Sequence, residues 1–258
     1  MKKATVLLLS SLFLLLSCSK EDDTSKLSPE GFPKSSNQKN TGTSANDMLA
    51  NNAFKSMVIE VAYVQGFEPS TTAINNFVAF LNERINKPDG IRVVKRVIAS
   101  TGKTSFTDQE IIDIEVENRT LYNTDSEIAV WAYFADGESS KNTTESVVLG
   151  TAYRNTSFVI FQKTVQRLSG SFNQPNRSTY EATVIEHEFG HILGLTNLGT
   201  TLQSNHEDTT NEKHCITESC LMYWSTGTGG GISSMISGGS VPKLDTACLA
   251  DLKANGGK

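Results

Sequence analysis

Residues 183–197, TVIEHEFGHILGLTN, constrain the fold more than any other part of the chain. On a helix, His187 and His191 are one turn apart and present both imidazoles from the same face. Glu188 lies beside them, where its carboxylate can reach a water held at a metal ion. Gly194 stands where the helix is expected to end, because glycine adopts the left-handed conformation without strain. The stretch therefore predicts a metal-binding helix that closes at Gly194.

Further features argue against a chance occurrence of HExxH on a surface helix. The pentapeptide lies in an apolar helix whose start resembles a capping box, with Ser178 three residues before Glu181. Residues 214–223, HCITESCLMY, follow downstream and contain Met222. Strand and helix patterns also alternate before the motif. Together these features favour a functional site over a coincidence.

The HExxHxxG pattern resembles that of the metzincin metallopeptidases. The resemblance implies that His187 and His191 bind a catalytic zinc ion and that Glu188 is the general base. Met222 would form the Met-turn, an apolar floor beneath the zinc; a simple core methionine is the alternative. The implied function is a zinc-dependent metalloendopeptidase. A zinc hydrolase of non-peptide substrates, and a binding lipoprotein that keeps the fold and zinc without turnover, are the other hypotheses.

The third zinc ligand departs from the ordinary metzincin pattern. Catalytic zinc usually takes three protein ligands and leaves the fourth position to water. Ordinary metzincins supply the third ligand as a histidine three residues after the glycine, and here that position is Asn197. Asparagine is a weak zinc ligand beside imidazole or carboxylate. Two histidines remain downstream, His206 and His214.

The segment from His214 to Met222 reproduces the spacing H-C-x4-C-x-M found in archaemetzincins, in which that histidine is the third ligand. On this resemblance, His214 is the favoured third ligand and residues 196–213 are an insertion before it. His206 and Asn197 stay open as alternatives.

The cysteines also resemble the archaemetzincin pattern, in which four cysteines hold a second, structural zinc ion. Cys215, Cys220 and Cys248 match three of them, and Asp251 occupies the place of the fourth. Three thiolates and a carboxylate can bind zinc. Outside the cytoplasm, a Cys215–Cys220 disulfide that leaves Cys248 free is an equally good interpretation.

The chain before the motif has the order of a metzincin upper subdomain. Apolar and β-branched runs predict strands at residues 57–64, 91–98, 127–134, 147–153 and 157–162. Helices are expected after Ser70, after the capping box of Thr107 and Glu110, and over residues 243–253. In metzincins the fourth strand is the antiparallel edge that pairs with substrate; an edge covered by a loop is the alternative. We expect an α+β, metzincin-like fold: a mixed, twisted five-stranded sheet, the zinc-binding active-site helix, and a small, mostly irregular C-terminal subdomain.

The N-terminus predicts export and a lipid anchor. Residues 1–17 contain two lysines and an apolar run too short to span a bilayer with ease, as in a signal peptide. The sequence before Cys18 resembles a bacterial lipobox, which implies lipidation of Cys18; an incidental cysteine is the alternative. Residues 18–50 are rich in polar residues and predict a lipidated flexible tether. Residues 51–258 are long enough for one catalytic domain.

Charge bears on partners and location. The chain has 23 basic and 28 acidic residues, and removal of residues 1–17 takes away two lysines, which leaves 21 and 28 and a net charge of −7. Such an acidic chain is a poor candidate for nucleic acid. Acidic residues 21–23 after Cys18 resemble a tag for the outer face of the outer membrane, although a solvated tether explains them equally simply. We expect an outer-membrane lipoprotein of the bacterial cell envelope whose partner is a protein or peptide substrate.

Overall fold

The computed structural model describes residues 26–172, 174–227, 232, 236 and 239–258. The signal peptide predicted over residues 1–17 and the lipidation site predicted at Cys18 lie outside these ranges. Within them, no helix is both long enough and apolar enough to cross a membrane.

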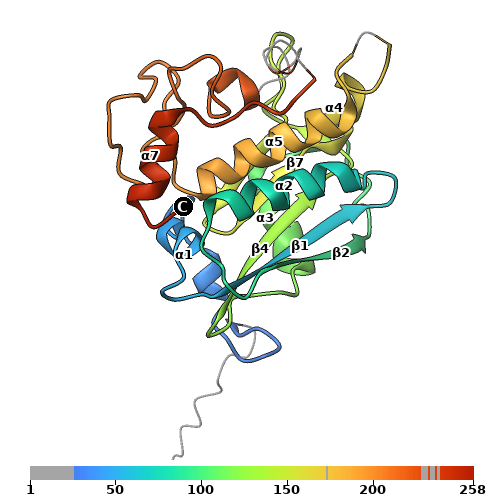
Figure 1. The fold of residues 1–258 in the computed structure, drawn as a ribbon. Helices are drawn as coiled ribbons and strands as arrows, with labels where there is room; N and C mark the ends of the chain where they lie inside the picture. Colours follow the sequence, from blue (N-terminus) through green and yellow to red (C-terminus); the bar gives the residue numbers. More distant parts are fainter. Residues whose placement is uncertain (1–25, 173, 228–231, 233–235, 237–238) are drawn as a thin grey trace, which may run out of the picture.

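A mixed five-stranded sheet forms the centre of the fold, in the order β2-β1-β4-β7-β6 (Figure 1). Its strands are β1 (Ser56–Val64), β2 (Ile91–Ile98), β4 (Glu127–Phe134), β6 (Gly150–Arg154) and β7 (Ser157–Ile160). The first four strands in this order are parallel to one another, and β6 runs antiparallel to β7 at the edge of the sheet. The predicted sheet is confirmed, although the edge strand begins at Gly150 rather than at residue 147. A separate parallel pair joins β3 (Ser105–Phe106) to β5 (Glu138–Ser139).

Helices cover both faces of the sheet, which explains why β1 and β4 are apolar on both sides. Helices α2 (Thr71–Arg84) and α5 (Arg177–Ile192) lie together over one face (Figure 1). There, Phe77 and Phe189 meet edge to face with ring centroids 5.1 Å apart. Helix α3 (Asp108–Asn118) packs its Ile111 and Ile114 on the other face, in a cluster with Trp131. Further helices in the described part of the chain are η2 (Lys34–Asn37), α1 (Ala45–Leu49), α4 (Gln162–Leu168), η3 (Trp224–Gly227) and α7 (Thr246–Ala254).

Two of the three predicted N-caps are present. Ser70 caps α2, and Thr107 forms the predicted capping box with Glu110 at α3. The predicted capping box of Ser178 and Glu181 at α5 is wrong, because Asn176 Oδ1 accepts from the backbone N–H groups of Ser178 and Thr179 instead. Glu181 is thereby free to accept from Ser70 N at 2.8 Å, which joins α5 to the start of α2.

Residues 34–50 are folded, which corrects the prediction of a flexible tether throughout residues 18–50. Met48 and Leu49 of α1 are fully buried in the main core. Asn37 is also fully buried, and its Nδ2 donates to three acceptors of the domain: Asn123 Oδ1 at 2.7 Å, Ala129 O at 3.0 Å and Thr156 Oγ1 at 3.1 Å. The segment is held by the hydrogen bonds of Asn37 and by the burial of the short helix α1, and neither leaves a long periodic apolar pattern in the sequence. The folded domain therefore begins before residue 51.

Candidate metal centre

Three imidazoles converge beside the C-terminal half of α5. The ring centroids of His187, His191 and His214 are 4.9, 5.3 and 5.1 Å apart in pairs. Each ring offers a nitrogen within 4.8 Å of the corresponding atoms of the other two. His214 comes from the irregular chain after α5. Three converging imidazoles are the donor set of a catalytic zinc site that keeps its fourth position open.

Backbone carbonyls orient two of these rings. His187 Nδ1 lies 2.8 Å from Leu221 O, and His214 Nδ1 lies 2.9 Å from Glu212 O. In the tautomer that donates these hydrogen bonds, Nε2 of each ring is the atom left for a metal. Burial, reinforced by neighbouring histidines, lowers the pKa of His187 to about 3 and that of His191 well below its usual value. Both rings are therefore neutral near pH 7, as metal binding requires.

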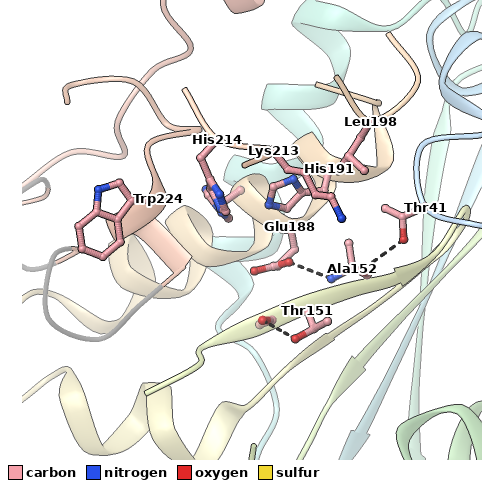
Figure 2. A pocket seen from close by; sticks show the side chains of 11 residues that line it. Thr41, Thr151, Ala152, Glu188, His191, Leu198, Lys213, His214 and Trp224 are labelled. Carbon is pink, nitrogen blue, oxygen red and sulfur yellow. Dashed lines mark hydrogen bonds between the residues drawn. The ribbon is translucent and has the colours of Figure 1, made fainter. Parts of the chain in front are cut away.

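Glu188 stands between this helix and the edge of the sheet. It is only 4% exposed, and its Oε2 accepts a hydrogen bond from Ala152 N of β6 at 2.9 Å (Figure 2). Burial raises the pKa of Glu188 to about 8, and the hydrogen bond from Ala152 opposes that rise. A divalent cation at the neighbouring imidazoles would favour the ionised carboxylate, which is the form that accepts a proton.

The chain leaves α5 through a turn at Gly194, as predicted. Gly194 has a φ of 76°, and a Cβ there would lie 2.7 Å from Thr200 N and 2.8 Å from Ala45 Cβ. Thr196 follows, also with positive φ, and its hydroxyl donates to Lys213 O. This contact holds the end of the predicted insertion against its beginning, and so brings His214 back to α5.

The alternatives for the third ligand lie elsewhere. Asn197 Nδ2 donates to Glu207 Oε2 at 3.1 Å in an exposed contact. His206 is buried, and its Nε2 lies 2.7 Å from Asp251 Oδ2, away from the three converging imidazoles. Of the three residues weighed from the sequence, His214 is the one that the structure brings to His187 and His191.

Met222, which the family resemblance predicts to be the Met-turn residue, packs against α5 at Gly190. Its side chain is fully buried, and a Cβ added to Gly190 would collide with its sulfur atom. The glycine inside the HExxH pentapeptide therefore has a packing role, because it lets the methionine segment approach the helix. Leu221, the residue before Met222, supplies the carbonyl that orients His187.

The cysteines of the sequence pattern form one buried cluster. Cys215, Cys220 and Cys248 are fully buried free thiols, with no disulfide among the described residues. Asp251 lies beside this cluster, hydrogen-bonded to His206 and to Gln203 N.

A cleft of about 300 Å³ opens over the three imidazoles. Gly150 and Ala152 of its lining belong to the edge strand that the sequence predicted beside the substrate, whereas four other lining residues were not anticipated: Thr41, Leu198, Lys213 and Trp224. Thr41 belongs to the N-terminal segment, and its hydroxyl donates to Ala152 O at 3.1 Å (Figure 2). Nothing in the local sequence around Thr41 indicates this role, because the contact depends on packing more than a hundred residues away.

No protein-family model matches the chain, and no curated protein matches it by sequence. Among solved structures, the fold is similar to the crystal structure of archaemetzincin from Methanopyrus kandleri, with a TM-score of 0.50 and 17% sequence identity. The match covers 78% of this chain and 96% of that chain. At this identity the likeness shows a shared fold, an archaemetzincin-like mixed sheet with several helices.

Proposed function

We propose that this chain is a zinc-dependent peptidase that cleaves peptide bonds with Glu188 as its general base. The observation that carries the proposal is the group of three converging imidazoles beside a buried carboxylate in a cleft. His187, His191 and His214 would hold the zinc ion. The archaemetzincin-like fold supports the proposal, since the sequence resemblance and the architecture agree on the same family of folds.

The donors present fit zinc. Neutral imidazole is a preferred ligand of Zn²⁺, and three of them leave a fourth position towards the cleft. Two of the rings have a backbone carbonyl behind the nitrogen that does not face the site, the usual arrangement around a metal-bound histidine. When bound, zinc polarises a carbonyl and lowers the pKa of a water.

Glu188 is suited to the proton transfers of hydrolysis. Its carboxylate accepts a proton from the attacking water and gives it to the leaving nitrogen. The hydrogen bond from Ala152 N to Oε2 fixes one oxygen and leaves Oε1 for this exchange. Because α5 carries both Glu188 and two of the imidazoles, their relative positions are set by one rigid element.

The edge strand favours a peptide over other substrates. β6 is the outer strand of the sheet and borders the cleft, so its outward N–H and C=O groups can pair with an extended chain. At Ala152 both groups are engaged, the N–H by Glu188 and the C=O by Thr41. A bound peptide would therefore pair with the strand on the Gly150 side.

Hydrolysis of casein or of a peptide library by the purified chain tests the proposal. We expect activity that a chelator abolishes and zinc restores. Glu188→Gln should keep zinc while hydrolysis falls by about 10²–10⁴-fold, the usual contribution of a general base. A zinc-loaded wild-type chain that hydrolyses only non-peptide substrates would favour another class of hydrolase. A chain without any turnover would favour a binding protein.

The ligand assignment has its own test. His214→Ala should lose catalytic zinc by metal analysis, because one of three protein ligands is removed. Asn197→Ala is the control, since Asn197 lies in the insertion before His214 and its side chain makes an exposed hydrogen bond to Glu207 at 3.1 Å. Equal zinc contents in the two variants would contradict His214 as a ligand.

A further inference from the structure

The buried cysteines share their pocket with His206. Cys215 Sγ lies 3.6 Å and Cys248 Sγ lies 3.9 Å from His206 Nδ1, and Cys220 Sγ lies 3.7 Å from Cys248 Sγ. All four side chains are at most 4% exposed. The archaemetzincin resemblance implies a structural zinc ion at these cysteines; we propose that in this chain its fourth ligand, beside the three thiolates, is the imidazole of His206. In this proposal Asp251 is a positioning residue for His206, in place of the ligand role expected from the sequence.

Three of the six separations among the four ligand atoms are close to those of a tetrahedral site. With metal–sulfur bonds of about 2.3 Å and metal–nitrogen bonds of about 2.0–2.1 Å, tetrahedral angles place two sulfurs about 3.8 Å apart and a sulfur and a nitrogen about 3.6 Å apart. The observed distances are close to these values: 3.7 Å between the sulfurs of Cys220 and Cys248, and 3.6 and 3.9 Å from His206 Nδ1 to the sulfurs of Cys215 and Cys248. A disulfide would require two sulfurs about 2.05 Å apart.

Backbone N–H groups point at the sulfur atoms, as expected for anionic ligands. Thr217 N donates to Cys215 Sγ at 3.5 Å. Met222 N and Asp245 N both donate to Cys220 Sγ at 3.4 Å. Donors directed at sulfur stabilise a thiolate more than a thiol, and thiolates are the form that binds metal.

Both carboxylate oxygens of Asp251 are already engaged. Oδ2 lies 2.7 Å from His206 Nε2, and Oδ1 accepts from Gln203 N at 2.6 Å. A carboxylate behind the far nitrogen of an imidazole fixes the ring so that its other nitrogen, here Nδ1, faces the metal. In this proposal His206 takes the ligand position of the fourth cysteine, and Asp251 holds the His206 ring there through its hydrogen bond to Nε2.

Asp245 is the competing oxygen ligand. Its Oδ2 lies 3.2 Å from Cys215 Sγ, but its Oδ1 caps α7 by accepting from Cys248 N at 2.8 Å. Asparagine caps a helix as well as aspartate does. Asp245→Asn therefore removes the charged ligand atom and keeps the cap.

The second site would also brace the first, and this part rests on the proposed function. Cys215 directly follows His214, and Cys220 directly precedes Leu221, whose carbonyl orients His187. His206 lies within the insertion that leads to His214. One buried ion would therefore tie together the chain segments that position two of the three catalytic imidazoles.

Cobalt substitution of the full chain tests the site without reference to peptidase activity. Co²⁺ bound to thiolates gives near-ultraviolet sulfur-to-metal charge-transfer absorption, and the catalytic imidazoles contain no sulfur. We expect two Co²⁺ per chain and this absorption in the wild type. His206→Ala should weaken the sulfur-bound ion by more than about 100-fold, Asp251→Asn by about 10–100-fold, and Asp245→Asn should leave it unchanged.

If His206→Ala fails to fold, His206→Cys provides a second variant for the test. Its fourth thiolate should bind the ion, so this variant should show the sulfur-to-metal absorption. The proposal is overturned if the absorption is absent from the wild type, if thiol titration finds a disulfide, or if Asp245→Asn alone abolishes binding. It is also overturned if Asp251→Asn abolishes the absorption and His206→Ala preserves it. Absorption without peptidase activity would refute only the proposed function, and activity without absorption only this second site.

Discussion

Gly150 lies so close to Glu188 that a Cβ on the glycine would stand 2.6 Å from Glu188 Cγ and 2.9 Å from its Oε1. Glu188 Oε2 meanwhile accepts the N–H of Ala152, two residues along the same strand. The carboxylate is therefore fixed between α5 and the edge strand β6. A side chain at position 150 would collide with Glu188, so the sheet edge positions the Glu188 carboxylate as well as bordering the cleft.

Gly150→Ala should destabilise the protein through its contact with Glu188. Overpacking of this kind costs about 1–3 kcal/mol of the free energy of unfolding. In a Glu188→Ala background Cγ is absent, so the same substitution should cost much less. Denaturant unfolding of the wild type, the two single variants and the double variant measures this difference. Equal costs in both backgrounds would show that the crowding at Gly150 has another origin.

Asn37→Ala tests whether the N-terminal segment belongs to the fold. The substitution leaves the buried Asn123 N without its acceptor, whereas Ala129 O loses one donor and keeps Arg119 Nη2 at 2.8 Å. Each buried group without a partner costs about 1–3 kcal/mol, so a clear fall in melting temperature is expected. Gln38→Ala, at an exposed neighbouring position, is the control. If both variants melted like the wild type, residues 34–50 would be a dispensable tether after all.

The sequence predicted those elements whose burial leaves a periodic or continuous apolar pattern. β1 and β4 were recognisable because both of their faces are covered, and the helix of His187 because its ligand spacing fits one helical turn. The sequence did not predict that the N-terminal segment is folded, because the buried amide of Asn37 fixes it through hydrogen bonds. Such a residue leaves no apolar pattern in the sequence.

The cysteine cluster shows a different limit. The sequence spacing placed Asp251 in the ligand position, and His206 had no visible partner. Their hydrogen bond joins residues 45 positions apart, and only the packing of α7 against the insertion creates it. The spacing match identified His214 because it lies in one short segment with Cys215 and Met222, whereas His206 lies outside that segment and its partners depend on the tertiary fold.

We propose, from the sequence alone, that Cys18 carries a lipid that anchors the protein to the outer membrane. Cys18→Ala should then move the protein from the membrane fraction to the soluble fraction, since an acylated terminus is the anchor that the sequence predicts. Fractionation followed by immunoblotting measures this, with Ser19→Ala as the neighbouring control. Unchanged membrane association of Cys18→Ala would rule out the lipid anchor.

A chelator should remove the metal ions of the two sites at different rates. The catalytic imidazoles face a cleft of about 300 Å³, whereas the three cysteines are fully buried. A chelator should therefore reach the first ion sooner, and thiolate ligands should also hold the second ion more tightly than neutral imidazoles do.

In the cobalt-substituted protein, chelation should abolish peptide hydrolysis while the sulfur-to-metal absorption persists. Loss of that absorption should follow only on longer treatment or in denaturant, together with a fall in thermal stability, because the buried ion joins the insertion to α7. Re-addition of zinc after the first phase should restore hydrolysis fully, and after the second phase only in part. Simultaneous loss of hydrolysis and absorption, in one phase, would mean that the two groups of ligands do not act as separate sites.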